Sequence, residues 1–412
     1  AIGNSVLFSN TTASNNTGVG QDALLLNTTG ANNVAVGAGA LDSNTTASEN
    51  VAIGRSALQS NTTGATNTAV GDQALDQNTT GSNNTALGND ALTVNTTGHS
   101  NVAVGAQALD ANTTGIGSTA VGFSSLTEST GSYNTGLGSY SLFNHTTGGN
   151  NVAVGGFSLY NNTTASNNTA CGYGALLANT TGQNNVAVGT DALDANQTTS
   201  GNVAVGQNAL SDHTSGDDNI AIGRSALANN TTSTGNVAIG AGSFELNTTG
   251  TRNTGCGYAV AYPNTTGANN TAIGYTALGS NTTGIKNTAV GDQSLGANTT
   301  GNNGTAIGKD ALANNTTGVD NTAVGVQALD ADTTGQENVA VGINVLGTAT
   351  SASQNVAIGI AAGFSITSGG SNTLLGYVAG SNIITGTNNI CIGDTAQVSD
   401  GNSSNRIVIG NH

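Results

Sequence analysis

The chain has 412 residues, of which 61 are glycine, one is proline, 3% are aromatic and 7% are charged, and it has no methionine or tryptophan. So few large apolar side chains exclude the globular core that is usual for this length, and so little charge excludes an ordinary disordered chain. The net charge is −16 and the six basic residues are scattered, so we expect no nucleic-acid partner. What remains is a fibrous protein built from repeats.

Neither a membrane span nor a signal peptide is expected from the sequence. No run of apolar residues is long enough to cross a bilayer. Ala1 lies in the middle of a repeat, which predicts that the chain is a processed or truncated piece of a longer protein.

Glycine recurs every 17 residues from Gly3 to Gly410, apart from one 16-residue step between Gly122 and Gly138. A fixed period across the whole chain is the signature of a stacked repeat architecture. We therefore predict an all-β fold, a parallel β-solenoid of about 25 coils, in which the repeat glycines are structural. Regular examples of these glycines are Gly37, Gly54, Gly71, Gly88 and Gly105.

One repeat unit, residues 27–43, predicts the structure of a coil. Val34–Val36 is predicted to be a short strand bounded by Asn and Gly turn residues, whereas Gly and Asn interrupt every helical stripe. A second, weaker strand is expected at Ala40–Leu41. A single coil cannot bury its apolar face, so the coils must stack, and ~4.8 Å per coil predicts a rod of about 115 Å.

The repeats also allow the two faces of the strand to be compared. From Gly18 to Ala357 the Ala35 position is always Ala or Gly, and the Val36 position holds Val, Ile, Leu or Cys. We expect the Val36 position to be buried, and since the Ala35 position never becomes polar, we expect that face to be covered too. Two interpretations stay open, a tight bend within one chain and a neighbouring chain on a shared axis. We favour the second, which makes the protein a homo-oligomer.

An Asn-Thr-Thr corner links one coil to the next and forms a candidate site. Each such Asn is formally an N-glycosylation acceptor, but stacked Asn side chains also form hydrogen-bonded ladders, and we favour the ladder. Asn144 and Asn196 add further Asn-x-Thr sequons. The Asn-Thr-Thr corners begin at Asn10, Asn27, Asn44, Asn61, Asn78, Asn95, Asn112, Asn162, Asn179, Asn230, Asn247, Asn264, Asn281, Asn298 and Asn315.

Two other functions for the polar residues are weaker alternatives. Flat Thr arrays on β-solenoids bind ice, but Thr28 and Thr29 are adjacent and should point to opposite faces. Asp42, Asp76 and Asp110 lie two coils apart, which avoids stacked carboxylates. Calcium is the alternative reading of these oxygen-rich coils, although the calcium β-roll signature is absent. We therefore expect no cofactor and keep calcium as an alternative.

The cysteines and histidines do not form a catalytic group in the sequence. Cys171 and Cys256 hold the Val36 position five coils apart, beyond the reach of a disulfide, and with Cys391 we interpret them as small buried apolar residues. The histidines are also scattered, and no Gly-rich loop opens a helix to hold a phosphate. We therefore expect no enzyme activity and no metal site. The histidines are His99, His145, His213 and His412, of which His145 and His213 replace the corner Asn.

The segments Asn33–Gly37, Asn50–Gly54 and Asn202–Gly206 resemble the Asn-Ser-Val-Ala-Ile-Gly repeats of trimeric autotransporter adhesin heads. The longer pattern, Asn-Thr-Thr-Gly-x-Asn-Asn-Thr-Ala-x-Gly, is similar to repetitive tail-fibre-like shafts. In those shafts an Arg-Ile-x-Ile-Gly-Asn stretch commonly precedes a chaperone domain, and residues 406–411 match it. The resemblance implies a β-solenoid whose chains associate in threes.

The sequence divides into a regular shaft, residues 1–360, and variant coils of the same solenoid, residues 361–412, which lose Asn-Thr-Thr and gain Ile and Leu. We expect a structural fibre shaft outside the cell or on a virion, which is a rigid spacer for adhesion to a host, with any receptor contacted by a tip absent from this sequence. A filament of solenoids stacked end to end is the alternative function, since an uncapped solenoid end is a template for pairing.

Overall fold

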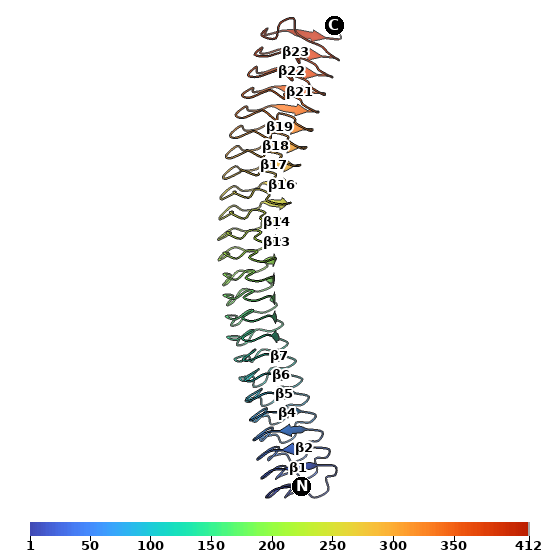
Figure 1. Cartoon of the computed structure of the whole chain (residues 1–412), viewed down its shortest axis with the longest axis vertical. Helices are drawn as coiled ribbons and strands as arrows, with labels where there is room; N and C mark the ends of the chain where they lie inside the picture. The colour runs from blue at the N-terminus through green and yellow to red at the C-terminus, as the bar shows by residue number, and fades with distance from the viewer. Residues whose placement is uncertain (411–412) are drawn as a thin grey trace. The chain divides into compact units, whose positions relative to one another are not determined.

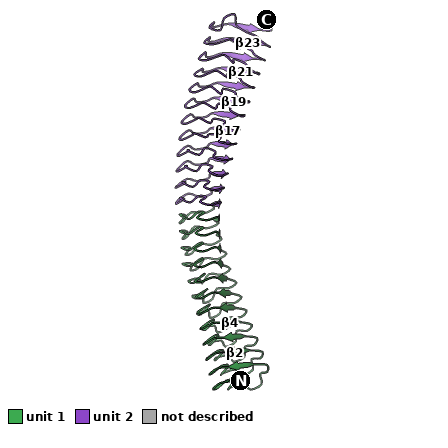
Figure 2. Ribbon diagram, viewed as in Figure 1, with its two compact units in different colours: residues 1–202 green, residues 203–412 purple. Residues whose placement is uncertain are grey.

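The computed structural model describes residues 1–410, so that Asn411 and His412 lie outside it. Two compact units, residues 1–202 and the residues from 203 onward, divide the chain (Figure 2). Every regular element in the described part is a three-residue β-strand, and one strand occurs in each coil (Figure 1). The predicted all-β parallel β-solenoid is confirmed.

Within the first unit each strand pairs in parallel with the next. The partner lies 17 residues along the chain, as in Ala35 and Ala52, except between β7 and β8, where Thr119 pairs with Thr135. The strands of this unit are β1 (Thr17–Val19), β2 (Val34–Val36), β3 (Val51–Ile53), β4 (Thr68–Val70), β5 (Thr85–Leu87), β6 (Val102–Val104), β7 (Thr119–Val121), β8 (Thr135–Leu137), β9 (Val152–Val154), β10 (Thr169–Cys171) and β11 (Val186–Val188).

The second unit repeats the same parallel pairing in the same register. Its strands are β12 (Val203–Val205), β13 (Ile220–Ile222), β14 (Val237–Ile239), β15 (Thr254–Cys256), β16 (Thr271–Ile273), β17 (Thr288–Val290), β18 (Thr305–Ile307), β19 (Thr322–Val324), β20 (Val339–Val341), β21 (Val356–Ile358), β22 (Thr373–Leu375), β23 (Ile390–Ile392) and β24 (Ile407–Ile409).

The 17-residue glycine period has a steric cause. Gly37, directly after β2, has a φ of 143°, and a β-carbon there would lie 2.2 Å from the carbonyl oxygen of Gly54 in the next coil. Only glycine combines that φ with so close an approach of two backbones. The repeat glycines are therefore needed wherever a strand ends and the chain turns.

The expected second strand at Ala40–Leu41 is wrong. This segment is a turn, and Leu41 has a φ of 51°. A left-handed conformation costs a leucine about 1–2 kcal/mol, but both side chains become fully buried. Two adjacent apolar residues can therefore share one interior here, because the turn between them replaces the alternation of a strand.

The strand faces the core with its middle residue. We call the first, middle and third residues of all strands the Val34, Ala35 and Val36 columns. Ala35 is fully buried, whereas the strand's two valines are only half-buried. The expectation that the Val36 position is buried is therefore wrong. Leu41 fills most of the narrow interior, so only a small side chain fits opposite it.

The core composition changes in the variant coils after residue 360. Leu374 holds the Ala35 position of β22, and glycines replace leucine at Gly363 and Gly380. A β-carbon on Gly363 would lie 2.6 Å from Leu374 Cδ1, so the large and small residues have exchanged sides. Of the Arg406–Asn411 stretch, residues 407–409 form β24.

Candidate functional site

The corner Asn residues, Asn44 and its equivalents, form the Asn44 column, which is a buried hydrogen-bonded ladder. Asn44 Nδ2 donates to Asn27 Oδ1 at 2.8 Å and to the Ala47 carbonyl oxygen at 3.0 Å. Asn27 and Asn44 are fully buried, and only the first rung, Asn10, is exposed. Because both protons of Nδ2 are donated, a glycan on this nitrogen would have to leave the ladder.

The Asn44 column consists of separate ladders. In the first unit one ladder runs from Asn10 to Asn112 and another from Asn162 to Asn196. In the second unit a ladder runs from Asn247 to Asn315. The remaining rungs of this column, which belong to none of these ladders, are Ser129, His145, His213, Asn230, Asp332, Ala349, Ile366, Ile383 and Asp400.

A second column of buried Asn residues was missed by the sequence reasoning, which treated them as turn residues. We call the residue before each strand the Asn33 column. Asn33 Oδ1 accepts the backbone N–H of Asn50 at 3.0 Å, and Asn33 Nδ2 donates to the Ala47 carbonyl oxygen at 2.9 Å. Each side chain therefore ties its own coil to the next at two backbone positions. The signal was available, since Asn precedes every strand except β7, β18 and β24.

The two threonines of each corner have different roles. Thr28 Oγ1 donates to the Thr45 carbonyl oxygen at 2.9 Å, and the same bond joins successive coils. The following residue, equivalent to Thr46, is exposed. Only one threonine of each pair therefore presents its hydroxyl group to solvent, as the prediction of opposite faces required.

The Val36 column is an exposed apolar surface. Ile53 is 41% exposed, Leu87 47% and Ile273 41%. Cys171 and Cys256, which belong to this column, are exposed free thiols, so the interpretation of these two as buried is wrong, whereas Cys391, in the Ala35 column, is buried. The error follows from the assignment of the strand's inner face. An exposed row of aliphatic side chains is unusual on a protein surface that faces only water.

Comparison with known proteins adds no identity. No protein-family model and no curated protein matches the chain. The resemblance to tail-fibre-like shafts and autotransporter heads therefore stays a prediction from the repeat motif.

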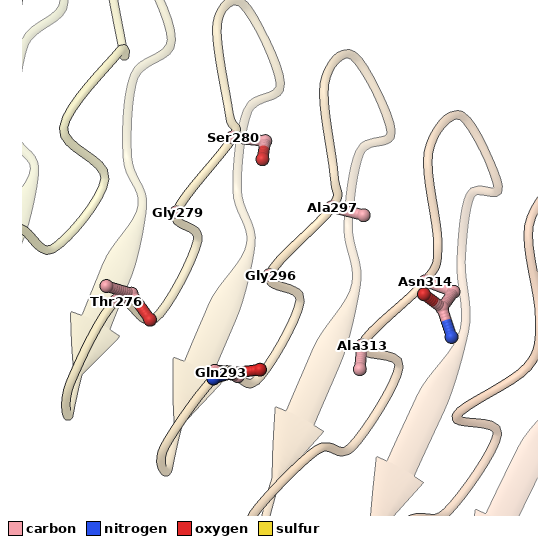
Figure 3. Close-up of a pocket in the computed structure, with 8 residues that line it drawn as sticks. All are labelled: Thr276, Gly279, Ser280, Gln293, Gly296, Ala297, Ala313 and Asn314. Atoms are coloured by element: carbon pink, nitrogen blue, oxygen red, sulfur yellow. The ribbon is translucent and has the colours of Figure 1, made fainter.

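Small residues open a groove on the second unit (Figure 3). Gly279, Gly296 and Ala313 hold the position of Asp42 in three successive coils, so no long side chain covers the backbone there. The groove has a volume of about 380 Å³ and is also lined by Thr276, Ser280, Gln293, Ala297 and Asn314. These side chains are neutral and include no general base beside a hydroxyl group.

A cluster of aromatic rings accompanies the interruption of the Asn44 column in the first unit. Phe143 and Tyr160 are stacked with ring centroids 5.3 Å apart, and Tyr140 stacks on Phe157 at the same distance. These coils contain or adjoin Ser129 and His145, where no Asn ladder forms. We interpret the stacked rings as replacement contacts between coils. The cluster is completed by Phe123 and Tyr173.

Titratable groups lie mostly apart from one another. Burial raises the pKa of Asp42, Asp76 and Asp110. Among residues 1–410, no three His, Cys, Asp or Glu side chains gather in a metal-binding arrangement. In the same range no helix is long and apolar enough to span a membrane.

Proposed function

We propose that the chain is a structural, fibre-like protein whose solenoid is a rigid shaft on a virion or cell surface and associates laterally with other copies, as a trimer. The observation that carries the proposal is the composition of the Val36 column. Thr occupies the Val34 column in 12 of 24 strands but never occupies the Val36 column. Both positions face outward on the same strands, so orientation does not explain why their compositions differ. We attribute the difference to a partner surface that covers the Val36 column and not the Val34 column.

Strand propensity does not explain this difference. Thr and Val are both favoured in strands, whereas Leu and Cys lack the β-branch. Leu87, Leu137 and Leu375 nevertheless occupy the Val36 column. Selection at this column is therefore for apolar character, which has value only if an apolar partner surface excludes water from it.

A second copy of the chain is the partner that fits this column. Successive strands present the column once per coil, and only a surface with the same spacing matches it throughout. The 24 described strands offer 24 residues in the Val36 column, one per strand, within the roughly 20–30 residues per partner of a stable interface. The Val36 column also carries no charge that would oppose contact between identical surfaces.

The ladders support a mechanical role. Backbone pairing, the two Asn columns and the Thr bonds repeat in coil after coil, so stability is distributed along the chain instead of depending on one core. Such a structure holds attached groups apart without needing a catalytic site. Adhesion and a location outside the cell belong to this proposal.

Two sets of substitutions that differ only in their position along the strand test lateral association. Val70→Thr, Val104→Thr and Val154→Thr place Thr in the Val36 column of the first unit. The matched control, Val51→Thr, Val102→Thr and Val152→Thr, places Thr in the Val34 column, where it is common. The first triple variant should dissociate the oligomer in light-scattering measurements, while the control stays assembled. A monomeric wild-type chain, or equal loss in both variants, would contradict the proposal.

The exposed thiols report register and distinguish the alternative function. In parallel copies with matched coils, Cys171 should cross-link to Cys171 of another copy and not to Cys256. Electron microscopy then separates a discrete lateral assembly of about 115 Å from an end-to-end filament, which would be far longer. Filaments without Cys171 cross-links would favour axial polymerisation.

A further inference from the structure

The Asn ladder of the second unit ends at an acid. Along this ladder each Asn Nδ2 donates to the Asn Oδ1 of the preceding coil, at 2.8 Å for Asn298 to Asn281 and 3.1 Å for Asn315 to Asn298. The next rung is Asp332, which is fully buried. The next three residues of the column are Ala349, Ile366 and Ile383, so Asp332 is the last polar rung before a run of apolar ones.

Two acceptor atoms are left unpaired at this rung. Asn315 Oδ1, which elsewhere in the ladder accepts from the next amide, has no hydrogen-bond partner, and neither has Asp332 Oδ2. Asp332 Oδ1 accepts the backbone N–H of Gly335 at 3.0 Å. Asn112, the last rung of a ladder in the first unit, accepts from Gly115 in the same way. Asp332 Oδ2 therefore takes the place of the donating amide nitrogen.

We infer that Asp332 is a neutral carboxylic acid in the folded protein and that its Oδ2 hydroxyl donates to Asn315 Oδ1, which makes this rung a proton-dependent joint. With the proton bound, both unpaired atoms are satisfied. Without it, a buried carboxylate faces another acceptor, an arrangement that costs far more than a lost hydrogen bond.

The surroundings supply no positive charge to hold the ionised form. In the coils next to Asp332 the column contains Asn315 and Ala349. The coil that follows, residues 338–354, has no charged residue. Lys309, Asp320 and Glu337 are exposed on the outside, and Asp310 and Asp330 are half-buried there. Burial raises the pKa of Asp332 from 3.8 to about 7, against the lowering effect of the Gly335 N–H.

The direction of the pH effect follows from the raised pKa. Between pH 3.8 and about 7 the unfolded chain has lost this proton while the folded chain retains it. Stability from this rung is therefore complete below pH 3.8 and falls as pH rises, by up to about tenfold in the folding equilibrium constant per pH unit. Above pH 7 the joint is ionised and open to water. It marks the boundary between the Asn ladder and the apolar rungs.

The test compares the wild-type chain with Asp332→Asn, in which an amide replaces the acid and restores the regular rung. Asp320→Asn, which removes an exposed carboxylate one coil earlier, is the matched control for charge. In infrared spectra of the folded protein at pH 5.5, the carbonyl band of protonated acids should be of equal intensity in the wild-type and control chains and weaker in Asp332→Asn. Equal spectra in all three would overturn the inference.

Hydrogen exchange at the backbone around residues 315–335 provides a second readout that is local and does not require complete unfolding. Exchange corrected for its intrinsic pH dependence should accelerate between pH 4 and pH 7 in the wild type by about tenfold or more, and stay constant in Asp332→Asn. An unchanged wild-type exchange rate, or the same acceleration in Asp332→Asn, would contradict the inference that this rung depends on the proton of Asp332.

Discussion

Gly255 lies against the ring of Phe244 in the core of the second unit, where a β-carbon on the glycine would lie 2.6 Å from Phe244 Cε2. Phe244 holds the position that is Leu41 in the regular coil, and Gly255 holds the Ala35 position of the next strand. The larger ring is accommodated because the opposite residue has lost its only side-chain atom. Interior volume is conserved between adjacent coils, as it is where Leu374 meets Gly363.

This pair predicts a compensating double variant. Gly255→Ala should destabilise the chain by about 1–3 kcal/mol, because the added methyl group overpacks the core. Combining it with Phe244→Leu restores the regular pair and should recover most of that loss. Denaturant unfolding of both variants measures the effect, and an additive, uncompensated loss in the double variant would show that the two residues do not share this space.

The repeat glycines should tolerate substitution far less than Gly156, a glycine of the first unit with open space around it. Gly71 has a φ of 143°, and a β-carbon there would lie 2.2 Å from the Gly88 carbonyl oxygen, so Gly71→Ala should cost about 3 kcal/mol or more. Gly156 has no left-handed φ, and a β-carbon there would meet no atom closer than 3.7 Å, so Gly156→Ala should cost under about 1 kcal/mol. Thermal unfolding of the two variants makes the comparison, and similar losses would refute the steric origin of the period.

The Asn ladder should contribute to stability and resist glycosylation. Asn78 Nδ2 donates to Asn61 Oδ1 and to the Gly81 carbonyl oxygen, both at 2.9 Å, and Asn78 Oδ1 accepts from Asn95. Asn78→Ala leaves buried partners unsatisfied and should cost about 3 kcal/mol, against under about 0.5 kcal/mol for the exposed Thr80→Ala. Mass spectrometry of chain secreted from a glycosylating host should find no glycan on Asn78, and an occupied site would mean that the rung opens.

His145 should give a pH dependence opposite in sign to that of Asp332. Burial lowers the pKa of His145 from 6.5 to about 4, so its neutral form stabilises the fold above pH 6.5. That stability is lost as pH falls from 6.5 to about 4, by up to about 1.4 kcal/mol per pH unit. His145→Asn should reduce the dependence, leaving the part of the same sign that comes from His213, whose pKa is also lowered by burial, and the exposed His99→Asn should not reduce it. If the free energy of unfolding depended on pH in the same way in the wild type and in His145→Asn, this prediction would be wrong.

The sequence was sufficient to predict the fold but not to predict which side chains of a coil face the core. The glycine period predicted the stacked coils because backbone contact leaves no room for another residue. The inner face of the strand could not be read from Val34–Val36, since all three residues are apolar, and the deciding quantity, the width of the interior, depends on the left-handed turn at Leu41. Because that turn buries two adjacent apolar residues, Ala40–Leu41 resembled a strand in the sequence. Asn33 was assigned to a turn, although its buried side chain ties two coils together.

The missing residue between Gly122 and Gly138 leaves the strands in register, since Thr119 still pairs with Thr135. The corner at Ser129 and Thr130, which lacks one of the two usual threonines, takes up the whole difference. Coil length is thus decoupled from strand pairing. The corner is therefore the part of the coil where a change in chain length should leave the backbone ladder undisturbed.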